Sequence, residues 1–181
     1  MSEKYKFDNP EGIYFVTLSI VHWIDLFTRK EFKWIMVDAI KHCQENKVLI
    51  VYAWCLMPSH LHLIISTKGD VLPGILRDFK KFTSKEIIKT IPLIHESRHD
   101  WLLNAFSKAG KDIKRIKGYK VWQDGNHPEL LESNKFFDQK LDYIHFNPVE
   151  AEIVDEPENY WYSSARDCSG NKGLVNVEFI G

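Results

Sequence analysis

Two β-rich runs lie only two residues apart in the middle of the chain, and this spacing constrains the fold more than any other feature. Residues 48–57 and 60–67 are both rich in the β-branched and aromatic residues that favour strands. The connection between them is Pro58-Ser59, and a two-residue connection is typical of a tight turn. The sequence therefore predicts an antiparallel β-hairpin at the centre of the fold.

The segments around this hairpin complete an α+β pattern. Residues 13–21 read as another strand, and apolar residues at three-four spacing predict helices over about 29–45 and 72–91. A short strand is expected over 119–123. A last helix should run from its capping residue Ser133 to about Phe146, closed by Pro148. This order predicts the split βαβ arrangement of a ferredoxin-like antiparallel sheet, with an appended C-terminal helix.

The length and the cysteine content predict one domain in a reducing compartment. A chain of 181 residues suits a single domain over 1–181, with a core over about 13–165 and a tail over 166–181. No run approaches the roughly 20 apolar residues of a membrane span, and the N-terminus lacks signal-peptide character. Three cysteines without a C-x-x-C pair do not predict a disulfide framework. We therefore expect a cytoplasmic protein.

Charge is divided unevenly along the chain although the net charge is only −1. Residues 1–120 carry +7 and residues 121–181 carry −8. Two basic runs stand out: Arg77, Lys80, Lys81, Lys85 and Lys89 at helical spacing, then Lys108, Lys111, Lys114, Arg115, Lys117 and Lys120. Such runs most often form a solvated face, but two runs flanking one site could also hold phosphates.

The second strand of the hairpin begins with His60-Leu61-His62. Side chains alternate across a strand, so His60 and His62 should project from the same face. Two adjacent imidazoles form half of a divalent-metal site, since histidine is the commonest metal ligand. The alternative is a pair of histidines that only pack on the sheet, each with a local hydrogen bond.

A second group of polar residues, Tyr143 and Asn147, lies at the end of the last predicted helix. The two are four residues apart and therefore share one helix face. An amide oxygen at Asn147 could complete a metal site begun by two histidines, and the Tyr143 phenol could act as a nucleophile. The alternative is that Tyr143 packs as an ordinary amphipathic residue and Asn147 caps the helix before proline.

Taken together, these motifs resemble the single-tyrosine HUH transposases, and most of all the branch of REP-associated tyrosine transposases. The motifs that carry the resemblance are Met57-Pro58-Ser59-His60-Leu61-His62-Leu63-Ile64, Tyr143-Ile144-His145-Phe146-Asn147-Pro148-Val149 and Tyr160-Trp161-Tyr162-Ser163-Ser164, with shorter matches at Tyr14-Phe15-Val16-Thr17, Phe79-Lys80-Lys81 and Val121-Trp122-Gln123. Their order and spacing cover the chain from about Tyr14 to Ser164.

The resemblance implies a nuclease that cuts and rejoins single-stranded DNA beside a hairpin. By this resemblance His60 and His62 bind a divalent ion, Mg²⁺ or Mn²⁺, and Asn147 is the third ligand. Tyr143 would become joined to the 5′ phosphate. Basic residues Lys80, Lys81, Lys85, Lys114 and Arg115 are the candidate DNA contacts. Many relatives work as homodimers in which the tyrosine helix of one protomer completes the site of the other, whereas others in the REP-associated branch act as monomers. The appended helix here could do either, and we expect a homodimer.

The chain departs from the family pattern directly after the Asn147-Pro148-Val149 motif, and other functions have to be weighed against the resemblance. Where the family often has Arg-Ala-Gly after Asn-Pro-Val, this chain has Glu150-Ala151-Glu152, and two acids would repel phosphate. A histidine-triad hydrolase would need a third histidine at Ile64, and a cupin would need many more strands. The serious alternative is a retired transposase that binds hairpin DNA without cutting it.

Overall fold

The computed structural model describes residues 7–69, 71–111, 113 and 118–180. Its centre is an antiparallel sheet in the order β2-β3-β1-β4. The strands are β1 (Tyr14–Ser19), β2 (Leu49–Leu56), β3 (His60–Thr67) and β4 (Glu129–Leu130). This is the strand order of a ferredoxin-like sheet, so the predicted α+β fold class is confirmed.

The predicted hairpin forms β2 and β3. Its turn is closed by a hydrogen bond of 2.8 Å from the Met57 N–H to the His60 carbonyl. β3 is the central strand next to β1, with Thr17 opposite His62 and Ser19 opposite His60. Because β3 is covered on both faces, every residue after His60 in it is buried.

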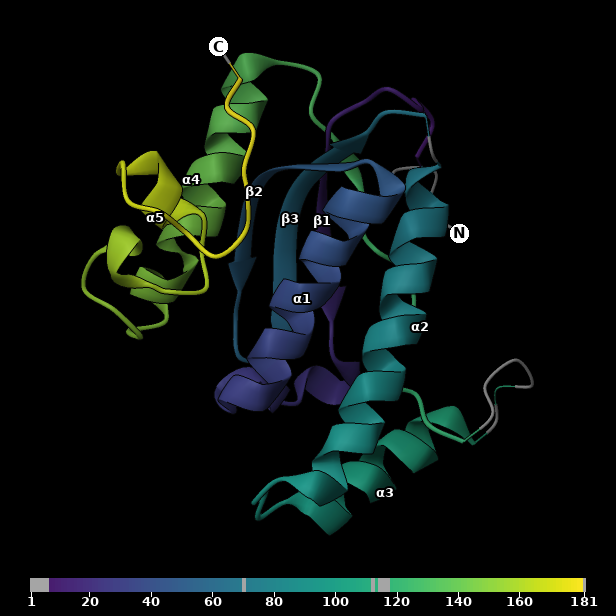
Figure 1. Ribbon diagram of the computed structural model, residues 1–181. Helices are drawn as coiled ribbons and strands as arrows, with labels where there is room; N and C mark the ends of the chain where they lie inside the picture. The colour runs from purple at the N-terminus through teal and green to yellow at the C-terminus, as the bar shows by residue number, and fades with distance from the viewer. Residues whose placement is uncertain (1–6, 70, 112, 114–117, 181) are drawn as a thin grey trace.

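Two long helices cover one face of the sheet (Figure 1). They are α1 (Lys30–Lys47) and α2 (Leu72–Thr90), close to their predicted bounds. Their apolar stripes, which include Phe32, Ile40, Leu76 and Phe79, form the main core with the inner residues of the strands. None of the described helices is long and apolar enough to cross a membrane.

The other face of the sheet is covered by α4 (Asn134–Glu150), which gathers with the short α5 (Ala165–Cys168) on the β2 side (Figure 1). A smaller core beneath α4 joins Ile144 to Phe15, Cys55 and Ile64. Phe15 and Ile64 are a cross-strand pair two residues away from the Thr17–His62 pair. The same face of the sheet therefore carries α4 and, next to it, the two histidines.

The prediction that α4 ends at Pro148 is wrong. Ser133 caps the helix as expected and accepts a hydrogen bond from the Phe136 N–H at 3.2 Å, but the helix continues through Pro148 to Glu150. Proline lacks an N–H and its ring crowds the carbonyl four residues earlier, but in the last turn this costs one hydrogen bond and the helix continues past it. The Ala151 N–H then closes the turn on the Asn147 carbonyl at 3.0 Å.

The predicted strand over 119–123 is also misplaced. Trp122 makes an isolated bridge to Ile20, and the regular strand β4 forms later, at Glu129–Leu130. Residues 124–128 (Asp-Gly-Asn-His-Pro) interrupt the pairing, because Gly125 and His127 have positive φ angles and Pro128 has no N–H to donate. The unassigned region 92–118 contains the helix α3 (His99–Gly110).

Candidate functional site

His60 and His62 project from the same face of β3, as alternation along a strand predicts. Their ring centroids are 4.6 Å apart and the rings meet edge to face at 77°. This arrangement is rigid, because both residues belong to the central hairpin and pair with β1 on the other side. The two imidazoles are thus close enough to bind one ion together.

Each imidazole is hydrogen-bonded through Nδ1 to a neighbouring hydroxyl. His62 Nδ1 lies 2.9 Å from Thr17 Oγ1, and His60 Nδ1 lies 3.0 Å from Ser59 Oγ. His62 Nε2 is buried, and no described residue hydrogen-bonds to it. A buried polar nitrogen without a partner is costly, so this atom fits a ligand that the protein alone does not supply.

Burial keeps both histidines in the neutral form that binds metals. It lowers the pKa of His60 to about 4 and that of His62 to about 3. The charges of His60 and Lys140 lower the pKa of His62 further. Hydroxyl partners at Nδ1 orient each ring, as outer partners commonly do at metal sites.

Tyr143 lies beside His62 within the same chain. Its ring centroid is 5.3 Å from that of His62 and 6.0 Å from that of Phe15, and 46% of the side chain is exposed. Lys140, one turn earlier on α4, places its ammonium 4.4 Å from the Phe15 ring centre and 6.0 Å from the Tyr143 ring centre. The amine is held by an ion pair of 2.8 Å with Glu129 on β4.

Asn147 is half-buried one turn beyond Tyr143. Within the described part of the chain, no three His, Cys, Asp or Glu side chains gather in a way that could hold a metal ion. Among the described residues, the Asn147 amide on this helix face is the candidate for a third protein ligand, and it is neutral. A site of neutral ligands suits a hard divalent cation only when phosphate oxygens and water complete its shell.

The motif at residues 160–164 fixes α4 against the sheet. His145 Nε2 lies 2.9 Å from Ser164 Oγ, which also accepts from the Trp54 N–H at 2.9 Å. Tyr160 donates to the Leu56 carbonyl at 2.7 Å. These buried contacts tie the helix of Tyr143 to β2.

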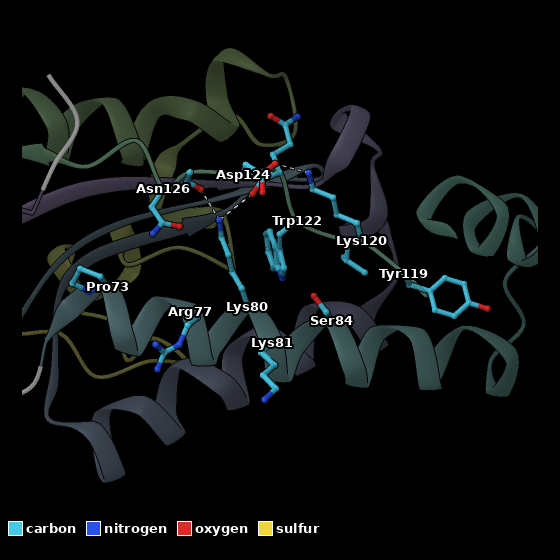
Figure 2. A pocket seen from close by; sticks show the side chains of 13 residues that line it. Pro73, Arg77, Lys80, Lys81, Ser84, Tyr119, Lys120, Trp122, Asp124 and Asn126 are labelled. Atoms are coloured by element: carbon cyan, nitrogen blue, oxygen red, sulfur yellow. Dashed lines mark hydrogen bonds and ion pairs between the residues drawn. The ribbon is translucent and has the colours of Figure 1, made fainter. Parts of the chain in front are cut away.

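The candidate DNA contacts on α2 divide into two kinds. Lys80 points toward the loop after Trp122 and donates to the Gln123 and Gly125 carbonyls at 3.2 and 2.6 Å (Figure 2). Lys81 and Lys85 are exposed. Lys114 and Arg115 lie outside the described residues.

A hollow of about 600 Å³ is lined by residues of α2 and of the segment 119–126 (Figure 2). We call it the α2 hollow. Arg77, Lys81 and Lys120 are the further basic residues of its lining, with Tyr119 and Trp122 as aromatic ones. The basic surface predicted from the sequence thus contains a concave region. Within it, Lys80 holds the loop at Gln123 and Gly125 in place.

Sequence reasoning missed three residues that the site depends on: Thr17, Ser59 and Lys140. Thr17 was hidden because strand register decides that its hydroxyl reaches His62, whereas Ser59 directly precedes His60 and could have been found from that position. Lys140 could have been found from its position three residues before Tyr143, which places it on the same side of the helix.

Comparison with known proteins identifies the fold. The sequence matches no protein-family model and no curated protein. The solved structure of a REP-associated tyrosine transposase bound to a REP hairpin is similar over 100% of this chain and 94% of that one, with a TM-score of 0.66 and 20% identity. The chain has the fold of that transposase. A provisionally assigned transposase from Deinococcus radiodurans R1 aligns more weakly, over 79% of this chain and 95% of that one, with a TM-score of 0.45 and 16% identity.

Proposed function

We propose that the protein is a metal-dependent endonuclease that cleaves and rejoins single-stranded DNA near a hairpin. The observation that carries the proposal is the position of Tyr143 beside His62. Their ring centroids are 5.3 Å apart, and the buried Nε2 of His62 has no hydrogen-bond partner among the described residues. The transposase of the same fold, which is bound to a REP hairpin, supports hairpin DNA as the substrate class.

The reaction uses Tyr143 as a nucleophile on a DNA phosphate. The phenolic oxygen forms a bond to phosphorus, and the bond from phosphorus to the 3′ oxygen breaks. The phenolic proton passes to water, which reaches the exposed side chain, and the departing 3′ oxygen takes a proton from water. The product is a 5′-phosphotyrosine and a free 3′ hydroxyl, and the reverse reaction rejoins a strand without a nucleotide cofactor.

The other residues of the site hold and orient the groups that react. His60, His62 and Asn147 would hold Mg²⁺ or Mn²⁺, which supplies polarisation of a phosphoryl oxygen when bound. Thr17 and Ser59 orient the two imidazoles. Lys140 places an ammonium beside the Tyr143 ring, where Glu129 holds it by an ion pair.

Replacing Tyr143 by Phe tests this proposal directly. Labelled hairpin DNA from the gene's own flanks, mixed with the protein and Mn²⁺, should give a covalent band on a denaturing gel. Tyr143→Phe removes only the nucleophilic oxygen, so the band should disappear while DNA binding and folding persist. Tyr162→Phe changes a half-buried tyrosine whose carbonyl pairs with Leu56 at the edge of β2, and as the matched control it should keep the band.

Two other results would change the assignment. A wild-type protein that binds the hairpin but gives no adduct would be the retired, non-cutting DNA binder, a function that the acids at Glu150 and Glu152 favour. An adduct that survives in Tyr143→Phe would move the nucleophile to another tyrosine.

A further inference from the structure

Two consecutive residues between β1 and α1, His22 and Trp23, have left-handed backbone conformations. Their φ angles are 56° and 55°. The turn is closed by a hydrogen bond of 3.4 Å from the Ile24 N–H to the Val21 carbonyl, so both central residues have the positive φ of a type I′ turn. Glycine and asparagine are usual there, and a bulky aromatic residue is strained. Strain of this kind concentrates at functional sites.

The strained turn places the indole of Trp23 at the edge of the candidate active site. Its ring centroid is 5.4 Å from that of His60, with the planes at 75°. The side chain is 57% exposed although it is large and apolar. Trp23 is therefore an exposed aromatic surface directly beside a proposed metal ligand.

Trp23 also lines a second hollow, of about 570 Å³, which we call the Trp23 hollow. Lys120, Gln123 and Asp124 line both this hollow and the α2 hollow, so the two adjoin along that segment. An extended ligand that follows them would pass from the basic surface of α2 to the indole and then to His60.

The charges along this path fit a polyanion. Among the described residues that line the two hollows, Asp124 is the one acid, and it belongs to both linings. An ion pair of 2.7 Å with Lys120 neutralises it. Arg77 and Lys81 remain exposed at the far end of the α2 hollow. An occupant with repeated negative charges and flat apolar rings matches this combination, and single-stranded DNA has both.

We propose that Trp23 is a stacking platform for one unpaired base of the DNA strand next to the phosphate that reaches His60 and Tyr143. The proposal rests on the proposed function, because it takes single-stranded DNA as the ligand. Stacking on an indole tolerates any base, so Trp23 adds affinity and fixes the position of the strand. Trp23 is a binding residue and takes no part in the chemical step.

Binding of a fluorescein-labelled DNA hairpin with an unpaired thymidine arm, followed by anisotropy, tests the platform. Trp23→Ala should weaken binding about 5- to 150-fold, the range expected for loss of one stacked base. Trp101→Ala is the matched control, since Trp101 on α3 is also exposed (54%). It should bind like the wild type. Trp23→Phe keeps a ring and should recover part of the affinity. Trp23→Gly suits the positive φ, so it should fold at least as well as the wild type and still bind weakly.

A scan with abasic nucleotides separates stacking from a general structural effect. Removing one base at a time from the thymidine arm should weaken binding to the wild type at one position. At that position the same removal should change nothing for Trp23→Ala, because the partner of the base is already gone. Equal binding by Trp23→Ala and wild type, or an abasic penalty that persists in Trp23→Ala, would overturn the inference.

The same samples distinguish failure of this inference from failure of the proposed function. A covalent adduct at Tyr143 together with binding that ignores Trp23 would overturn the platform and leave the nuclease intact. Binding that depends on Trp23 without any adduct would support the platform and remove the catalytic proposal.

Discussion

At the scale of single residues, the site depends on how the two nitrogens of His62 are divided between the protein and a ligand. Thr17 occupies Nδ1, and Nε2 has no partner among the described residues. Alternation along the strand is sufficient to predict that His60 and His62 share a face. It cannot predict Thr17, which comes from another strand 45 residues away and reaches His62 only in the observed register.

Replacing Thr17 by Val should weaken divalent-metal binding without unfolding the protein. Valine keeps the β-branched shape but cannot hold the imidazole, and loss of such an outer partner typically costs about 10- to 100-fold in metal affinity. Titration with Mn²⁺ measures the effect. Thr67→Val, which removes a hydroxyl contact to the Val48 carbonyl at the far end of β3, should leave the affinity unchanged. Equal affinities for Thr17→Val and wild type would contradict this role.

At the scale of helices and strands, the parts that sequence patterns predict well are those whose own periodicity decides their form. α1, α2 and the β2–β3 hairpin belong to this group, and their bounds agree within a few residues. The position of the last strand and the end of α4 depend instead on contacts that the periodicity of the segment does not contain. Residues 121–123 pair with the end of β1 only briefly before the turn at Gly125, and the last turn of α4 is closed by backbone after Pro148.

Lys80 and Lys81 are neighbours on α2 but should respond oppositely to substitution. Lys80→Met leaves the Gln123 and Gly125 carbonyls without their ammonium donor, which should lower the free energy of unfolding by about 1–3 kcal/mol. Lys81→Met should stay within about 0.5 kcal/mol of wild type but bind DNA more weakly, with a salt slope reduced by about one. Urea unfolding and hairpin binding at several salt concentrations measure the two effects. Charge reversal at Lys80 would therefore disturb the fold as well as any DNA contact.

The difference in unfolding free energy between wild type and Lys80→Met should also depend on pH. Burial lowers the pKa of Lys80 to about 8, with Asp124 acting to raise it and Lys120 to lower it. Between this value and the ordinary pKa near 10.5, the unfolded chain holds more protons than the folded one, so the contribution of Lys80 to stability rises with pH. The difference in unfolding free energy between wild type and Lys80→Met should grow from pH 8 to pH 10. A difference that shrinks over this range would contradict the burial of the amine.

At the scale of the whole molecule, the proposed site forms within one chain, since Tyr143 and His62 of the same chain are neighbours. The expected homodimer is therefore not needed to bring them together. Mixing Tyr143→Phe with His62→Ala, each inactive alone, should not restore the covalent adduct. Recovery of the adduct in the mixture would show instead that the tyrosine helix is exchanged between two copies.

The outer edge of β2 is covered by segments that follow it in the chain by more than a hundred residues. The Leu56 N–H donates to the Tyr162 carbonyl, and the Val51 carbonyl accepts from the Glu178 N–H, each at 2.9 Å. An uncovered strand edge is a template for pairing with other chains. During translation, β2 leaves the ribosome more than a hundred residues before Tyr162 does. The nascent chain therefore carries an open edge until residues 162–178 have emerged, and this is the interval in which it is most exposed to aggregation and to capture by chaperones.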